Sequence, residues 1–493
     1  MSRKSKANPL GTAGAEGKAT GAAQATEAEA GAAESTGPGA RVAGSAWAAV
    51  RIWTQAYRVE LALFVVTYGV LASFSSQRFL RQSAAPHFVY QAKAWLDGRT
   101  DLDFETLYSA MGRNTPQHPI LEDWACVRDD GAGRKERCEG DVRPTDRWYS
   151  SFPWFPALLM VPFVAVNGYQ LNDTSFGVGA AALAIVAFYS LLRRLARDHE
   201  AERTFAENAA LAVLLAFGTL FFYCAIRGEV WFSAEVMGVG LTCLYLRNAL
   251  GARRPLVAGL FYSMAVLTRA PLMFTGLFFV LECLAPGPSG RLAQLTAPGP
   301  DLKPRLRKLA LFGLGAAPLA VSAALYNKVR FGAFAEFGHR FFYWNRVNAD
   351  IDQFGLFSSK YLGRNLDAAL FKLPQVSLNP LRFSYDPHGM SLLVTLPLLV
   401  FLLVPKRRPR LHWPLWATVA VTALPGLFYQ NDGYMQFGFR FSLDYLPYLL
   451  LLFFVGGWPL RNRWVLAAST LGVLVAFWGA VAFRGYTELV RSW

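Results

Sequence analysis

The amino-acid sequence predicts an all-α polytopic membrane protein, and three observations support this fold class. First, 53% of the 493 residues are hydrophobic and only 17% are charged, whereas soluble domains average about 45–50% apolar and about 25% charged residues. Second, the apolar residues fall in runs near the length of roughly 20 residues that crosses a bilayer. Third, Lys and Arg residues concentrate in alternate connections between these runs. Together these features exclude a soluble multidomain enzyme.

The first segment of the chain has a different composition. Residues 1–45 consist mostly of Ala, Gly, Glu, Thr and Ser with scattered Lys. Such a segment has too little apolar surface to offset the entropy lost on ordering. We therefore expect a disordered cytoplasmic tail over 1–45, followed by a transmembrane domain over 55–493.

Eleven apolar runs are predicted to be transmembrane helices. They cover residues 59–76, 174–195, 208–226, 230–249, 255–269, 271–286, 308–326, 389–404, 412–429, 441–457 and 464–483. A further apolar stretch, 153–168, is short and contains three prolines, so an interfacial or re-entrant segment is predicted there.

Charge placement predicts the orientation of these helices. Basic clusters such as those within 193–203 and 406–410 fall in alternate connections, and such connections face the cytoplasm. The N-terminus is then cytoplasmic, and the two long loops, 77–173 and 327–388, face outward. The net charge of +15 thus relates to membrane orientation, and no nucleic-acid partner is expected.

Cysteines and histidines predict one disulfide and no metal site. Cys126 and Cys138 flank a short polar stretch in the first outer loop, where an oxidising environment favours a disulfide between them; the alternative is two free thiols. The other three cysteines lie within apolar runs and are expected to pack there. The six histidines, including His388, have no metal-ligand spacing. No cofactor is therefore expected.

Several charged residues lie at the predicted outer edge of the membrane, where charge is costly unless it serves a function. They are Glu229, Glu235, Arg269 and Arg440. The guanidinium fork suits the phosphate of a lipid carrier, because it matches phosphate oxygens and stays ionised. The alternative for each residue is a structural ion pair or an interfacial side chain.

Short motifs within residues 55–455 resemble the GT-C membrane glycosyltransferases, especially the protein O-mannosyltransferase and lipid A aminoarabinose transferase branches. The stretch from PHFVY at 86–90 to Gly98 matches the segment after the family's first span. WYSSFPWFPALLMVPFVAVNG at 148–168 resembles its proline-rich juxtamembrane element. Three shorter matches are Arg227-Gly228-Glu229, Thr268-Arg269 and RFGAFAEFG at 330–338.

The resemblance implies a function at the outer face of a bacterial inner membrane. Such enzymes take a sugar from a polyprenyl-phosphate carrier and transfer it to a hydroxyl of a glycan, lipid or protein acceptor. In this chain, however, His87 and Phe88 replace the family's acidic pair, and Ser150 or Ser151 replaces the acidic residue before the proline-rich element. The base that accepts the acceptor's proton is then His87 or Glu229, or one of the loop carboxylates. These are Asp97, Asp101, Asp103 and Glu105.

The predicted site combines these residues. Arg269 and Arg440 would hold the carrier phosphate and stabilise it as a leaving group, and Tyr434 and Trp231 would shape the sugar site. Two alternatives are a catalytically inactive lipid-binding or flipping protein on the same scaffold and a secondary transporter. The latter would show inverted repeats and broken helices at the bilayer midplane.

Overall fold

The computed structural model describes residues 57–102, 123–131, 133–198, 200–284, 302–343, 345–378, 381–384 and 386–491. The chain divides into two compact units, Met1–Arg58 and Val59–Trp493, and the second contains nearly all of the described residues. The predicted tail, 1–45, and two of the loop carboxylates, Asp103 and Glu105, lie outside the described residues.

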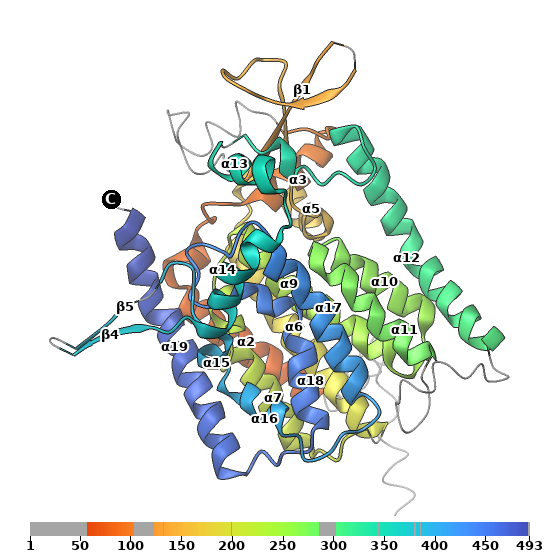
Figure 1. The fold of residues 1–493 in the computed structure, drawn as a ribbon, viewed down its shortest axis with the longest axis vertical. Helices are drawn as coiled ribbons and strands as arrows, with labels where there is room; N and C mark the ends of the chain where they lie inside the picture. The colour runs from red at the N-terminus through yellow and green to blue at the C-terminus, as the bar shows by residue number, and fades with distance from the viewer. Residues whose placement is uncertain are drawn as a thin grey trace, which may run out of the picture. The chain divides into compact units, whose positions relative to one another are not determined.

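The described residues are mainly helical, with a small amount of β structure (Figure 1). The helices are α2 (Arg58–Ser75), α3 (His87–Leu96), α5 (Phe155–Asn167), α6 (Asp173–Arg197), α7 (Phe205–Phe217), α8 (Phe221–Ala225), α9 (Val230–Ala249), α10 (Pro255–Val266), α11 (Gly276–Leu284), α12 (Leu302–Phe331), α13 (Asn345–Phe354), α14 (Leu362–Leu366), α15 (Leu392–Thr395), α16 (Val400–Leu403), α17 (His412–Phe428), α18 (Leu446–Val455) and α19 (Arg463–Arg491). The 3-10 turns include η5 (Ala270–Thr275), η7 (His339–Phe341), η10 (Pro397–Leu399) and η11 (Arg440–Asp444).

Four helical segments among the described residues are long and apolar enough to cross a membrane. They are Arg58–Leu80, Asp173–Arg197, Leu302–Phe331 and Arg463–Ala482. Most of the other predicted spans coincide with shorter apolar helices, such as Pro255–Val266 and Leu446–Val455. The structure thus has transmembrane-length helices, and the number eleven stays a prediction.

Two predicted spans are not continuous helices. Residues 208–226 form α7 and α8, which are separated at Gly218. Residues 389–404 form α15, η10 and α16. Pro397 accounts for the second break, because its ring disfavours helical geometry at the preceding residue and it has no N–H to donate; Leu396 indeed has φ −143° and ψ 73°.

The central helices α6, α9, α10 and α12 lie side by side in that order (Figure 1). Glycine brings α10 and α12 into backbone contact. A Cβ atom at Gly259 would lie 2.0 Å from the Phe312 carbonyl oxygen, and one at Gly315 would lie 2.1 Å from that of Leu256. Small residues at such crossings allow the close packing that associates helices in lipid.

Helix α5 occupies the stretch for which an interfacial segment is predicted. Its 13 residues extend about 20 Å, short of the roughly 30 Å of a bilayer core. Ala157 and Met160 are buried against α3, whereas Phe163 and Val166 on the opposite side are exposed. A short helix with one packed and one exposed apolar face fits the interfacial prediction.

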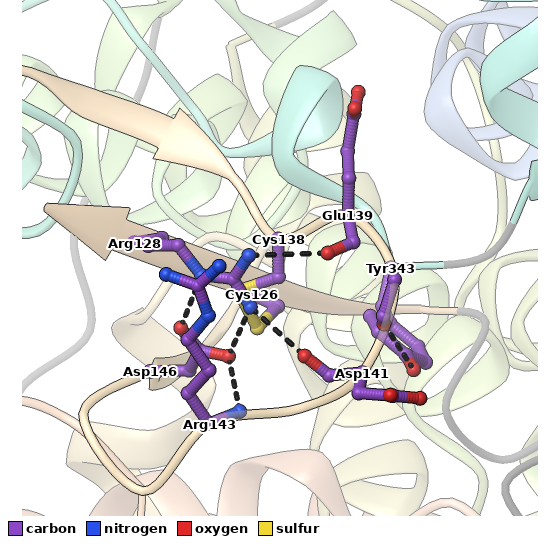
Figure 2. Close-up of a disulfide and its surroundings, with 9 residues drawn as sticks. Cys126, Arg128, Cys138, Glu139, Asp141, Arg143, Asp146 and Tyr343 are labelled. Carbon is purple, nitrogen blue, oxygen red and sulfur yellow. Dashed lines mark hydrogen bonds and ion pairs between the residues drawn. A yellow bond between two sulfur atoms is a disulfide. The ribbon is translucent and has the colours of Figure 1, made fainter. Parts of the chain in front are cut away.

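The first long loop, 77–173, contains a three-stranded antiparallel sheet. It consists of β1 (Trp124–Asp129), β2 (Lys135–Arg137) and β3 (Arg147–Ser150) in the order β2-β1-β3. The expected disulfide between Cys126 and Cys138 is present and joins β1 to the end of β2. Figure 2 shows Arg128 beside this disulfide, donating to both carboxylate oxygens of Asp146 at 2.7 and 2.8 Å.

The second long loop, 327–388, packs against this sheet. The Tyr343 amide donates to the Trp124 carbonyl at 3.2 Å, and Ala125 pairs with Phe342. A separate hairpin follows, consisting of β4 (Gln375–Leu378) and β5 (Leu381–Ser384). The two loops predicted to face outward therefore form one connected layer around β1 and η7.

We expect the disulfide to stabilise this layer. Replacing both Cys126 and Cys138 by Ser should lower the free energy of unfolding of the sheet by about 3 kcal/mol, since the bridge closes a short loop in the unfolded chain. Limited proteolysis of the purified protein should then cleave within 123–150 faster. Cys283→Ser, which changes a free cysteine in α11, is the control; equal cleavage of both variants would contradict the prediction.

Candidate functional site

Two arginines and two carboxylates meet between α9, the start of η5 and η11. Arg269 donates from Nε and Nη2 to the two carboxylate oxygens of Asp444, at 3.0 and 2.7 Å. One oxygen of Glu235, Oε1, lies 3.6 Å from Arg269 Nη2 and 3.3 Å from Arg440 Nε. Glu235 is almost completely buried, so this single carboxylate holds two guanidinium groups next to each other. We call these four residues the arginine cluster.

The arginine cluster has donors left over. Within the described part of the chain, Arg269 Nη1 and Arg440 Nη2 make no hydrogen bond. The Arg269 side chain keeps 16% of its surface exposed. Because guanidinium N–H groups bind carboxylate and phosphate oxygens strongly, these donors could hold an anionic ligand without breaking the Arg269–Asp444 pair.

A second ion pair lies beside the arginine cluster. Arg227 donates from Nε and Nη2 to the two oxygens of Glu229, at 3.2 and 2.9 Å, and both residues are buried. The Phe232 ring lies 5.0 Å from the Arg227 guanidinium and 5.5 Å from that of Arg440. The ring therefore connects the two groups of charges through cation–π contacts.

The position of this second pair depends on a glycine. A Cβ atom at Gly228 would lie 2.2 Å from the hydroxyl oxygen of Thr174 and 2.8 Å from its backbone nitrogen. Only glycine lets the turn between Arg227 and Glu229 approach the start of α6 this closely. Ser233 then fixes the start of α9 by donating to the Gly228 carbonyl at 2.8 Å.

His87 and Trp231 lie in an aromatic group at the start of α3. The His87 ring stacks on Trp124 at 3.9 Å, and its centroid is 6.3 Å from that of Trp231. Neither ring nitrogen has a hydrogen-bond partner of good geometry. Burial lowers the pKa of His87 to about 3, against a smaller opposing effect of the Ala85 backbone. His87 is thus a weak base with little access to a substrate.

Glu229 is also a weak base in this structure. Burial favours its neutral form, but the positive charges of Arg227 and Arg78 and the hydrogen bonds from Arg227 outweigh this effect. Together they lower the pKa of Glu229 to about 2. Its carboxylate therefore serves to neutralise Arg227 rather than to accept a proton at neutral pH.

The remaining predicted site residue is Tyr434, which contacts Arg440 of the arginine cluster. Tyr434 is exposed, and its carbonyl accepts from Arg440 Nη1 at 3.4 Å. Its ring lies 5.5 Å from that of His388. The structure therefore brings Glu229, Trp231, Arg269, Tyr434 and Arg440 into one connected set, with His87 at its edge.

The loop carboxylates and the serines that replace an acidic residue lie in different surroundings. Asp97 pairs with Lys93, and Asp101 pairs with Arg99 at 3.2 Å; both pairs are partly exposed. Ser151, in contrast, donates to the Asp123 carbonyl at 3.3 Å. Burial is the larger cause of the raised pKa of Tyr429, and the negative charge of Asp123 is close enough to add to this shift.

Sequence reasoning missed the second group of this site, the pair His388 and Asp432. His388 Nδ1 lies 2.8 Å from Asp432 Oδ1. The two residues are 44 positions apart, and neither belongs to a recognisable motif, so only the folded structure brings them together. Asp444 was also missed, although its position one helical turn after Arg440 in RFSLD placed it on the same side of the chain.

The only group of potential metal ligands among the described residues is Cys126, Cys138 and Asp146. The two sulfur atoms are bonded to each other, and Asp146 accepts from Arg128 and from the Arg143 amide. The three side chains of this group therefore have structural partners and are not free to bind a metal ion.

In comparisons with known proteins, no family model, no curated protein and no solved structure matches the chain. Function is therefore inferred from the residues of the site.

We expect substitutions that break the buried Arg227–Glu229 pair to lower the free energy of unfolding more than substitutions that break an exposed ion pair. Arg227→Ala leaves a buried carboxylate without its partner and should destabilise the protein by about 3–5 kcal/mol. The double variant Arg227→Ala/Glu229→Ala should recover part of this loss. Thermal unfolding in detergent measures both, with Arg253→Ala, which removes an exposed ion pair with Asp198, as the control. Equal effects of Arg227→Ala and Arg253→Ala would contradict the prediction.

Proposed function

We propose that the protein is a membrane glycosyltransferase of the GT-C type, which moves a sugar from a polyprenyl-phosphate carrier to a hydroxyl of an acceptor. The observation that carries this proposal is the arginine cluster. Glu235 holds two arginines side by side, and each retains an unused donor. Paired guanidinium groups at a membrane edge suit one phosphate with an apolar tail.

The cluster would act on the leaving group. When the acceptor oxygen attacks the anomeric carbon, the bond from that carbon to the phosphate oxygen breaks, and negative charge develops on the phosphate. Donors already in place at that oxygen stabilise the developing charge without reorganising. Asp444 and Glu235 neutralise the two arginines in the free protein, so the cluster has no net positive charge to attract a phosphate. The phosphate would instead bind through hydrogen bonds from Arg269 Nη1 and Arg440 Nη2.

Aromatic side chains beside the cluster suit the sugar. Trp231 lies next to Phe232, and Tyr434 lies beyond Arg440 with half of its surface exposed. Aromatic faces pack against the apolar face of a pyranose, and the tyrosine hydroxyl can hydrogen-bond its substituents. The acceptor class (glycan, lipid or protein) then depends on the outer layer formed by the two loops.

A lipid-binding or flipping protein without transferase activity is the second candidate. The burial of His87 and the pairing of Glu229 favour it, because both bases named from the sequence are weak here. The two candidates share the arginine cluster and differ in whether the carrier–sugar bond is broken. A secondary transporter, the other alternative, would instead move its substrate across the membrane.

Localisation follows from the same proposal. We place the protein in a bacterial inner membrane, with the basic connections in the cytoplasm and the layer around β1 and η7 in the periplasm. Lys and Arg concentrate in the short basic links, whereas the short connections that alternate with them contain only Arg227, Arg269 and Arg440, as the positive-inside rule requires.

Arg269→Ala and Arg440→Ala should each reduce release of the sugar from a polyprenyl-phosphate donor by about 100-fold or more, as expected for loss of transition-state charge stabilisation. Arg269→Lys should also lose much of the activity, because it keeps the charge but not the two bonds to Asp444. Release of sugar and binding of donor are measured separately in reconstituted vesicles.

The matched control is Arg253→Ala, an arginine outside the site with an exposed side chain. Unchanged turnover in Arg269→Ala and Arg440→Ala would contradict the phosphate role. Donor binding by the wild type without any release of sugar would favour the lipid-binding candidate. Movement of a solute across the vesicle membrane would favour a transporter.

The orientation is tested by labelling. Leu378→Cys, at an exposed position in β4, should react with a membrane-impermeant maleimide in intact spheroplasts. Arg253→Cys, in a basic connection, should react only after the membrane is opened. The reverse pattern would contradict the proposed orientation.

A further inference from the structure

The structure contains a histidine–aspartate pair beside the arginine cluster. His388 Nδ1 lies 2.8 Å from Asp432 Oδ1 and 3.1 Å from the Gly433 carbonyl oxygen. The Gly433 carbonyl can only accept a hydrogen bond, so Nδ1 carries a proton. The neutral ring then has its lone pair on Nε2.

Nε2 is available to a ligand. It makes no hydrogen bond among the described residues, and the His388 side chain keeps 37% of its surface exposed. Asp432, in contrast, is buried, with 5% of its side-chain surface exposed. A buried carboxylate that orients an exposed imidazole is the arrangement in which histidine acts as a general base.

Both turns that carry the pair are fixed by hydrogen bonds. The His388 amide donates to Asp386 at 2.8 Å, and Asp386 pairs with Lys372 at 2.9 Å. Gly433 has φ +91°, and a Cβ atom there would lie 2.4 Å from the Gln436 side chain. The turn after Asp432 therefore requires glycine.

Gln436 connects this pair to the arginine cluster. Its Nε2 donates to the carbonyls of His388 and Asp432, at 2.6 and 2.8 Å, and its Oε1 accepts from the Arg440 amide at 3.3 Å. The Tyr434 ring lies against the His388 ring, and the Tyr434 carbonyl lies against the Arg440 guanidinium. Gln436 and Tyr434 therefore each contact both His388 and Arg440.

We propose that His388, oriented by Asp432, is the base that takes the proton from the acceptor hydroxyl. This role rests on the proposed glycosyl transfer. The acceptor oxygen forms a bond to the anomeric carbon, its proton passes to His388 Nε2, and the electron pair of the broken bond leaves with the carrier phosphate held by Arg269 and Arg440. Asp432 is a positioning residue that stabilises the imidazolium formed.

The charged groups around the imidazole decide its titration. The hydrogen bond to Asp432 raises the pKa of His388, burial opposes this shift, and Lys372 and Asp386 act in opposite directions. Arg364, whose Nε lies 3.6 Å from Asp432 Oδ2, is a further charge next to the pair. A base must be deprotonated to act, so kcat/KM should rise with pH through this pKa.

The kinetic test compares His388→Ala and Asp432→Asn with the wild type, using a short-chain polyprenyl-phosphate hexose and a panel of alcohol acceptors. His388→Ala should lower kcat by about 100-fold or more and remove the rise with pH, while donor binding is kept. Asp432→Asn removes the carboxylate that raises the pKa of His388, so the rise of kcat/KM with pH in this variant should move to lower pH. Lys360→Ala, an exposed change in the same loop, is the control.

A chemical test does not depend on turnover. Diethyl pyrocarbonate acylates neutral, accessible imidazoles, so mass spectrometry should find His388 modified and buried His87 unmodified. The donor should protect His388, since the sugar would lie between it and the arginines.

The outcomes separate the two proposals. An active wild type whose rate and pH profile are unaffected by His388→Ala, or a His388 that the donor does not protect, overturns the role of this histidine and leaves the transferase proposal intact. A wild type that binds the donor but transfers no sugar overturns the transferase proposal and, with it, this role.

Discussion

The site depends on the cost of burying charge. Arg227 and Arg440 are buried and Arg269 is largely shielded from water, and an isolated charge in such surroundings is strongly unfavourable. Each is paired, and the pairing sets the geometry: Asp444 engages two nitrogens of Arg269, and one oxygen of Glu235 lies between Arg269 and Arg440. Because these residues come from α9, the start of η5 and η11, neutralisation also determines how these three segments meet. The close spacing of the two guanidinium groups is therefore a property of the folded protein itself.

Around this cluster, the protein combines rigid and exposed parts. Phe232 separates the two groups of charges, and the glycine at 228 lets the Arg227–Glu229 turn approach α6. The exposed components, Tyr434 and His388, belong to turns rather than to helices, but hydrogen bonds hold those turns in place. Such a site positions its reactive groups before a ligand arrives, which lowers the entropic cost of bringing them together.

Apolar length and composition located the four helical segments that are long enough to cross a membrane, because a run of apolar residues has few alternatives to a helix in lipid. They could not locate the breaks at Gly218 and Pro397, since hydrophobicity is continuous across both. The paired arginines were predictable from the cost of charge at a membrane edge. The burial of His87 was not, because it depends on stacking with Trp124, 37 positions away, and the His388–Asp432 pair depends on two turns that only the tertiary structure brings together.

Gln436 shows how narrowly one position can be specified. Its nitrogen faces two carbonyl oxygens, and its oxygen faces an amide N–H. A glutamate has the same shape, but when ionised it would place an acceptor against two acceptors in a site closed to water. Conversion of this amide to an acid, whether by a single codon change or by slow deamidation of the ageing protein, would therefore replace the two hydrogen bonds to the His388 and Asp432 carbonyls with electrostatic repulsion. The two turns would lose the residue that holds them together.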